Sequence, residues 1–101
     1  MDIQFLTRNS EKSTPKLKEP QEYLVLLLND HYTTMDFVVE VLMVIFHKTP
    51  EDAQRIMLDV HKKGKGLVGR YSWDIAVTKA EQVHAAAKEN EFPLRCIVEV
   101  G

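Results

Sequence analysis

The chain has almost no cysteine: Cys96 is the only one in 101 residues. A single thiol cannot form an intramolecular disulfide, so the apolar core alone must hold the fold. We therefore expect a reducing compartment, most simply the cytoplasm. A metal-binding pattern is missing too, because no pair among His31, His47, His61 and His84 has the close spacing of a zinc site. We expect neither a metal nor a cofactor.

Glycine and long apolar runs are also scarce. The four glycines form no phosphate-binding loop, because the GKG at 64–66 is the exit of a predicted helix. No apolar stretch reaches the roughly 20 residues of a membrane-spanning helix. The N-terminus lacks the basic-then-apolar order of a signal peptide. Because the net charge is only −2, we expect binding to neither nucleic acid nor membrane.

The residues that are present fit one small globular domain, with 45% hydrophobic and 28% charged residues. Splitting 101 residues into two domains would leave pieces too small to bury a core. Residues 1–20 mix both signs of charge with Ser, Thr, Asn and Pro and show no period. This pattern predicts a flexible N-terminal extension, followed by a core domain at 21–101.

The core domain opens with a predicted strand and helix. The apolar run EYLVLLL at 22–28 favours a buried strand. Thr33 then opens a helix that is predicted from Thr34 to Lys48, with Asp36 placed to complete a capping box. Apolar residues lie almost all round this helix, so we expect it to be largely buried.

The next two predicted elements have clear boundaries. Thr49 has the side chain of an N-cap, and Pro50 takes the first helical position, where its missing N–H is tolerated. Gly64 can supply the left-handed residue that ends this second helix. The stretch GLVGRY at 66–71 then predicts a short strand.

A third helix and a last strand complete the chain. Ser72 is the predicted cap of a helix at 73–90. The residues predicted on the inner face of this helix are Ile75, Ala76, Ala80, Val83, Ala86 and Ala87. The stretch LRCIVEV at 94–100 predicts the closing strand. The order strand, helix, helix, strand, helix, strand predicts a single small α/β (α+β) domain, in which a three-stranded antiparallel sheet packs against three helices.

A polar cluster separates the first strand from the first helix, in LNDHYTTMDFV at 28–38. Asn29 and Asp30 carry hydrogen-bond acceptors here. On the second helix His61 follows Met57 by four residues, so an imidazole shares a face with an apolar side chain. Three acceptors at the rim of an apolar pocket suit a peptide's free α-amino group followed by a hydrophobic first side chain. The alternative is a half-buried histidine at the edge of the core.

These stretches resemble the ClpS family of Clp protease adaptors. The blocks LNDHYTTMDFVVEVL, IMLDVHKKGKGLVG, TKAEQV and NEFPLRCIVE follow in order and cover about 22–99. The resemblance implies a small α/β domain that is not an enzyme. It also implies that this domain binds proteins whose first residue is Leu, Phe, Tyr or Trp. The adaptor then delivers them to the AAA+ unfoldase ClpA and the peptidase ClpP, in the bacterial N-end rule.

The resemblance also assigns a role to each matching residue. Asn29 and His61 match positions that hydrogen-bond the substrate's α-amino group, and Asp30 matches the first of two acidic positions near that cation. His31 stands at the second acidic position, where it brings an acceptor but no negative charge, and it would repel the ammonium once protonated. The positions that match the walls of the side-chain pocket are Thr33, Met35, Val38, Met57, Val60 and Leu94.

Two residues match positions that dock on the N-terminal domain of ClpA, namely Asp74 and Lys79. Between them Val77 replaces a usual glutamate, which predicts a weaker contact. Further departures from the family pattern are Thr34 in place of a proline and Phe92 in place of a histidine. The extension at 1–20 matches the family's flexible leader in position only.

Three alternatives fit part of the pattern. A protein-interaction module of similar fold would bind a fixed partner through its helix faces. A hydrolase would use Cys96 as its nucleophile, although a cysteine inside an apolar strand is usually inert. A paralogous adaptor would have a shifted preference for the first residue, and His31 is the residue that points to it.

Overall fold

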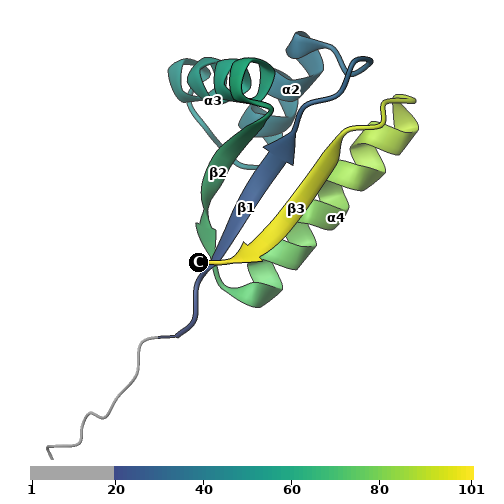
Figure 1. Cartoon of the computed structure of the whole chain (residues 1–101). Helices are drawn as coiled ribbons and strands as arrows, with labels where there is room; N and C mark the ends of the chain where they lie inside the picture. The colour runs from purple at the N-terminus through teal and green to yellow at the C-terminus, as the bar shows by residue number, and fades with distance from the viewer. Residues whose placement is uncertain (1–19) are drawn as a thin grey trace, which may run out of the picture.

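Between residues 20 and 101, three strands and three helices follow one another in the predicted order. A computed structural model describes residues 20–101. The predicted extension therefore lies, except for its last residue, outside the described part of the chain. The elements, drawn in Figure 1, are β1 (Tyr23–Leu28), α2 (Met35–Val44), α3 (Pro50–Lys63), β2 (Lys65–Tyr71), α4 (Trp73–Glu89) and β3 (Arg95–Val100).

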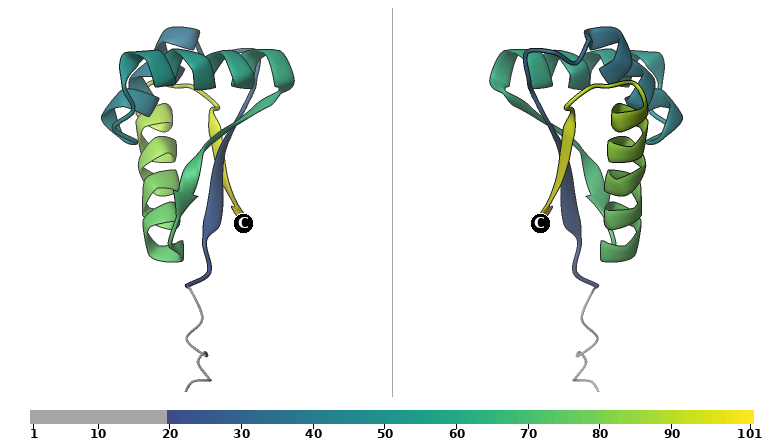
Figure 2. Two further views of the ribbon diagram at one scale, coloured as in Figure 1. Left: turned by 90° about the vertical axis from the view of Figure 1, so that its left-hand side faces the viewer. Right: turned by 90° about the vertical axis from the view of Figure 1, so that its right-hand side faces the viewer.

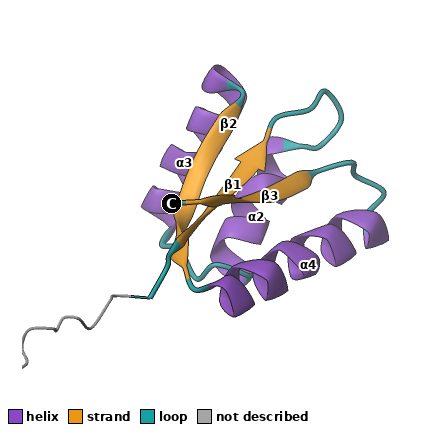
Figure 3. Ribbon diagram, turned by 60° about the horizontal axis from the view of Figure 1, so that its bottom comes forward, coloured by secondary structure: helices purple, strands orange, loops and turns teal. Residues whose placement is uncertain are grey.

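The sheet has its most apolar strand in the middle. The strand order is β2-β1-β3, and β1 pairs antiparallel with both neighbours (Figure 3). Val25 and Leu27 of β1 are fully buried and belong to the core cluster. Leu26 lies between them and points to the other face, because side chains alternate along a strand. The predicted antiparallel sheet is confirmed.

The helices cover one face of this sheet. In the two views of Figure 2, α4 runs along the sheet, while α2 and α3 lie at the end where β1 stops and β2 begins. The opposite face carries no helix from residues 20–101. None of the helices in this part of the chain is both long and apolar enough to cross a membrane. The sheet and the three helices enclose one core, whose fully buried large side chains are Leu27, Leu42, Ile56, Val25 and Val83.

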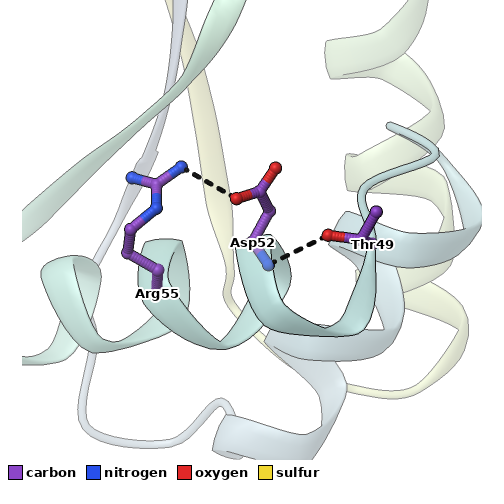
Figure 4. Close-up of polar contacts among 3 residues, drawn as sticks. All are labelled: Thr49, Asp52 and Arg55. Carbon is purple, nitrogen blue, oxygen red and sulfur yellow. Dashed lines mark hydrogen bonds and ion pairs between the residues drawn. The ribbon is translucent and has the colours of Figure 1, made fainter.

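Helix α3 begins and ends as predicted. The Asp52 N–H donates to the Thr49 hydroxyl at 3.2 Å, and Asp52 also lies 3.5 Å from the Arg55 guanidinium (Figure 4). Pro50 occupies the first turn. Gly64 has φ +88°, a left-handed conformation in which a side chain would be strained. The end of α3 is therefore sharply defined, and β2 starts at the next residue.

The start of α2 differs from the prediction by one residue. The N-cap is Thr34, whose hydroxyl accepts the Phe37 N–H at 3.1 Å. Thr33 is not the cap because its own N–H and hydroxyl both donate to Asp30. Asp36 therefore lies too early in the helix for the predicted capping box, although it is still in the first turn.

The predicted end of α2, at Lys48, was also wrong. The helix stops at Val44, and His47 has a positive φ of 57° that no regular helix contains. Pro50 requires an extended residue before it, and Thr49 has ψ 159°. The prediction that α2 is largely buried fails at its end as well, where Val44 is 65% exposed.

Helix α4 departs from the prediction at two positions. Ser72 is at the N-cap but makes no side-chain capping bond. Ile75 is 48% exposed, although it was expected on the inner face. The rest of the predicted inner face is confirmed. It contains mostly small residues at helical spacing, which lets α4 lie close to the sheet, and its buried residues are Ala76, Ala80, Val83 and Ala87.

Candidate functional site

A cavity of about 230 Å³ lies where the β1–α2 loop meets the first turns of α2 and the end of α3. Its volume exceeds the roughly 150 Å³ in which an apolar cavity can hold a benzene molecule. The cavity therefore has room for one large side chain. Its lining residues are Asn29, Asp30, His31, Thr33, Met35, Val38, Met57, Val60 and His61.

The apolar wall comes from the inner faces of two helices. Val38 on α2 and Met57 and Val60 on α3 are at most 7% exposed and belong to the core cluster. Met35, the first residue of α2, is 44% exposed and lies at the cavity's edge. An apolar side chain that enters the cavity would thus contact the core itself, with Met35 beside it.

Asp30 organises the loop that forms one side of the rim. Its Oδ1 accepts the N–H of Tyr32 at 2.8 Å and the N–H of Thr33 at 2.6 Å, and its Oδ2 accepts the Thr33 hydroxyl at 2.7 Å. Burial alone would raise the pKa of Asp30, but these hydrogen bonds and the neighbouring His31 together lower it below its ordinary value. Asp30 is thus held as a carboxylate whose oxygens are directed mainly at the loop.

The loop is also fastened to the end of α3. The Asn29 N–H donates to the Gly64 carbonyl at 2.9 Å, so Asn29 lies beside the turn that follows His61. Within residues 20–101 the side chains of Asn29, His31 and His61 make no hydrogen bond, and all three residues are exposed. Their acceptor atoms are available to a ligand at the cavity mouth.

The structure brings almost all the predicted pocket and rim residues to this one cavity. The exception is Leu94, which is 3% exposed in the core cluster and does not line the cavity. Helix periodicity had already placed Met57 and His61 on one face of α3. Asp30's bonds within the loop and the link from Asn29 to Gly64 had not been predicted. The signal that could have indicated the bonds of Asp30 is an Asp followed three residues later by Thr in a short polar loop.

The two predicted docking residues lie on α4, away from the cavity. Asp74 is exposed in the first turn of that helix. Lys79 is half-buried, and its Nζ donates to the Ile45 carbonyl at 2.7 Å and lies 6.0 Å from the centre of the Phe46 ring. Lys79 therefore ties α4 to the end of α2, a structural role that the sequence had not suggested.

Cys96 has the surroundings of a core residue. It is 4% exposed, and burial raises the pKa of its thiol to about 12. His84 is nearby, but its Nε2 accepts the backbone N–H of Cys96 at 3.0 Å instead of facing the thiol. Nucleophilic catalysis needs a thiolate, so the hydrolase alternative is contradicted. In the described part of the chain no three His, Cys, Asp or Glu side chains gather as a metal site would require.

Comparison with known proteins identifies the family. The model of the ATP-dependent Clp protease adaptor protein ClpS matches residues 18–97. The ATP-dependent Clp protease adapter protein ClpS of Syntrophus aciditrophicus (strain SB) is 63% identical over 81 residues, which are 80% of this chain and 76% of that protein. The ClpS protein of Acetivibrio thermocellus is 61% identical over 82 residues, 81% of this chain and 83% of that protein.

A solved structure of a ClpS protein also has a fold similar to that of this chain. The structure of Agrobacterium tumefaciens ClpS2 bound to L-phenylalaninamide has a TM-score of 0.79 and 37% sequence identity to this chain. The match covers 82% of this chain and 100% of that one. The family match covers nearly all of the described residues, including the whole cavity. The chain belongs to the ClpS family of ATP-dependent Clp protease adaptors, which are not enzymes.

Proposed function

We propose that this chain binds proteins through a free α-amino group and a bulky hydrophobic first side chain, Leu, Phe, Tyr or Trp. It then delivers them to the unfoldase ClpA for degradation by ClpP. The observation that carries the proposal is the cavity, whose apolar wall and acceptor-bearing rim lie side by side. A ligand with an ammonium group next to an apolar side chain complements both parts.

The ligand of the Agrobacterium protein supports this assignment. L-phenylalaninamide carries a free α-amino group and a benzyl side chain. In this chain the benzyl group would enter the cavity between Val38, Met57 and Val60, which are largely buried. The ammonium would remain at the rim, within reach of Asn29 and His61.

Physical magnitudes permit useful affinity. Burying a leucine-sized side chain contributes about 1.5–3 kcal/mol, and each hydrogen bond to a charged amine contributes roughly 1.5–3 kcal/mol. Association costs at least about 4 kcal/mol in lost freedom. Three such hydrogen bonds and one buried side chain are therefore compatible with micromolar binding, which corresponds to about −8 kcal/mol.

A binding experiment tests the recognition step. Fluorescence anisotropy with peptides that begin with Leu or Phe should show binding, whereas the same peptides with an acetylated N-terminus should not bind. Acetylation removes the positive charge and two amine protons but leaves the side chain unchanged. Equal affinity for free and acetylated peptides would rule out recognition of the amine.

Delivery is tested separately. With ClpA, ClpP and ATP, a reporter that begins with Phe should be degraded faster when this protein is added. Asp74→Ala should weaken the acceleration if α4 docks on the N-terminal domain of ClpA. Asp74 is the better probe of docking because Lys79 also holds α2 and α4 together. Unchanged degradation by the Asp74 variant would remove this position from the docking surface.

A further inference from the structure

Two histidines line the cavity from different elements. His31 belongs to the loop between β1 and α2, and His61 lies in the last turn of α3. Within residues 20–101 neither imidazole makes a hydrogen bond or an ion pair, and both residues are exposed. Both rings can therefore exchange protons with solvent at the place where we expect the ammonium group of a substrate.

The protonation state of an imidazole decides what it offers to a cation. A neutral ring has one nitrogen with a free lone pair, which can accept a hydrogen bond from the ammonium. A protonated ring has only donors and a positive charge, so it loses this bond and repels the ammonium. Histidine is the side chain whose charge ordinarily changes between about pH 5 and 8. Each histidine of the cavity should thus support binding near neutral pH and oppose it in mild acid.

Asp30 keeps its charge in mild acid. It is the only carboxylate among the described residues that line the cavity. Burial alone would raise the pKa of Asp30, but hydrogen bonds from Thr33 and Tyr32 and the neighbouring His31 hold it below the ordinary value of 3.8. Asp30 is therefore a carboxylate both near neutral pH and in mild acid, so a change of binding between these conditions has to come from other groups.

The remaining charged groups near the two histidines do not line the cavity. Each element packed around it contributes some of them, namely Asp36 in the first turn of α2, Asp59, Lys62 and Lys63 at the end of α3, and Lys65 at the start of β2. Asp59 lies 3.5 Å from Lys63, so these two charges partly offset each other. Lysines and carboxylates ordinarily keep their charge in mild acid, whereas imidazoles change theirs. The two histidines are therefore the groups expected to respond.

We propose that His31 and His61 together make substrate capture sensitive to pH, so that this chain binds its substrates near neutral pH and releases them in mild acid. This inference rests on the proposed function, because it requires the ammonium group at the cavity mouth. His61 supplies an acceptor on the end of α3 that protonation removes. His31 adds a second positive charge from the loop, so the response is steeper than one histidine would give.

The amine of the substrate acts in the opposite direction. A peptide α-amino group has an ordinary pKa of about 7.7–8, so a fall from pH 7.5 to 5.5 improves it as a ligand by less than about twofold. An ordinary imidazole passes from about one-tenth to about nine-tenths protonated over the same interval. A fall in affinity therefore has to come from the protein. We expect about tenfold from the lost acceptor and a further twofold to fivefold from the second charge.

Fluorescence anisotropy at two pH values measures the response. The probe is a peptide that begins with Phe and has no acidic or histidine residue. It carries a rhodamine dye, because the emission of rhodamine does not change with pH in this range. Its Kd at pH 5.5 should exceed its Kd at pH 7.5 by about tenfold or more. Circular dichroism at both pH values checks that the chain is folded.

Asparagine substitutions locate the effect, because asparagine keeps a hydrogen-bond acceptor but does not take up a proton. His31→Asn should reduce the ratio of the two Kd values by about twofold to fivefold, and His61→Asn should remove the larger part of the response. His47→Asn is the control, because His47 is exposed but does not line the cavity. Asparagine also tolerates the positive φ of 57° at this position. The control should leave the ratio unchanged.

The outcomes separate the two proposals. If the Phe peptide fails to bind at pH 7.5, the proposed function fails, and the pH sensitivity fails with it. If it binds at pH 7.5 and its Kd is equal or lower at pH 5.5, the pH sensitivity alone is overturned. An unchanged ratio in either His31→Asn or His61→Asn overturns the joint role of the two histidines. An equal fall of the ratio in His47→Asn also overturns it, because the response would then come from the whole fold and not from the cavity.

Discussion

Asn29 and His61 come from different elements, yet their acceptor atoms lie at one cavity mouth. Each hydrogen bond to a charged amine contributes about 1.5–3 kcal/mol. We therefore expect His61→Ala to raise the Kd of a Phe-initiated peptide by about tenfold to a hundredfold. Titration by fluorescence anisotropy measures the change.

The control for this substitution is another histidine. His84→Gln changes a ring on α4 but keeps an acceptor for the Cys96 N–H, and it should bind the peptide like the unmodified chain. Circular dichroism of both variants checks that they fold. If His61→Ala and His84→Gln gave the same Kd as the unmodified chain, the imidazole of His61 would have no part in binding.

Asp30 gives a pH-dependent prediction. Because its pKa is lowered in the folded protein, its contribution to stability is fully present above its ordinary value of 3.8 and is lost as pH falls through the lower folded value. Asp30→Asn should reduce the free energy of unfolding by about 1 kcal/mol near neutral pH. Urea denaturation should show this difference narrowing as the pH is lowered below about 4.

An exposed carboxylate far from the loop provides the comparison for Asp30. Glu99 pairs with Leu24 at the other end of the sheet, and its side chain accepts no hydrogen bond within residues 20–101. Glu99→Gln should change the free energy of unfolding by less than about 0.5 kcal/mol, both near neutral pH and below about pH 4. A pH-independent loss in Asp30→Asn would mean that the carboxylate's charge does not matter for the loop.

Asp30 also shows how far the sequence could predict this loop. Two adjacent threonines, Thr33 and Thr34, give equal signals for an N-cap. The choice depends on Asp30, which takes both the N–H and the hydroxyl of Thr33 and leaves Thr34 to cap α2. Helix signals alone do not include such competition from the preceding loop, so the predicted cap was one residue early.

At the scale of elements, the cavity depends on how closely α3 lies to β2. Gly66 is buried, and a Cβ there would lie 2.7 Å from Val60 Cγ2 and 3.0 Å from the Ile56 carbonyl. Gly66→Ala must therefore push α3 away from the strand. We expect a loss of about 1–3 kcal/mol in the free energy of unfolding. Peptide affinity should fall as well, because Val60 is part of the cavity wall.

Another glycine of the same strand is the matched control. At Gly69 the three atoms nearest to a Cβ would all be outer atoms of the Tyr71 side chain, at 3.1–3.2 Å, and none of these three belongs to α3. Gly69→Ala should therefore leave peptide affinity unchanged even if it lowers the melting temperature. If both variants weakened peptide binding to the same extent, the effect would come from general destabilisation and not from the distance between α3 and β2.

Element boundaries were predictable where the signal is local. Thr49, Pro50 and Gly64 define α3 within a few residues of its ends, and the structure agrees. The end of α2 has no such local signal, because the apolar pattern continues through Ile45. The Ile45 carbonyl instead accepts a hydrogen bond from the Nζ of Lys79, which lies 34 residues later in the chain. A contact of that kind cannot be found from periodicity.

For the whole molecule, the order of elements was enough to predict the architecture. Three short strands and three helices can bury their apolar faces in few ways, and a central strand as apolar as Leu24–Leu28 belongs in the middle of the sheet. The full lining of the cavity was not predictable from patterning, because a buried residue such as Val38 looks like any core residue. Helix spacing placed Met57 beside His61, but only the resemblance to ClpS proteins assigned Val38 to the same pocket.

A final prediction concerns the molecule as a cooperative unit. Cys96 is the only thiol in the chain, it is 4% exposed, and burial raises its pKa to about 12. A thiol reagent should therefore react with it very slowly in the native protein and quickly in urea, where β3 no longer packs against α4. The rate in the absence of urea then reports how often the protein opens.

Peptide binding decides whether this opening is local or global. Cys96 is not among the residues that line the cavity, so a bound peptide cannot shield the thiol directly. A Phe-initiated peptide at 100 times its Kd stabilises the folded state by about 2.7 kcal/mol and should slow labelling about a hundredfold if the whole domain opens together. The acetylated peptide should have no effect. Unchanged labelling with the free peptide would show that β3 opens while the cavity stays intact. We expect the slower rate, because β1 pairs with β3 and also leads directly into the loop that forms the cavity rim.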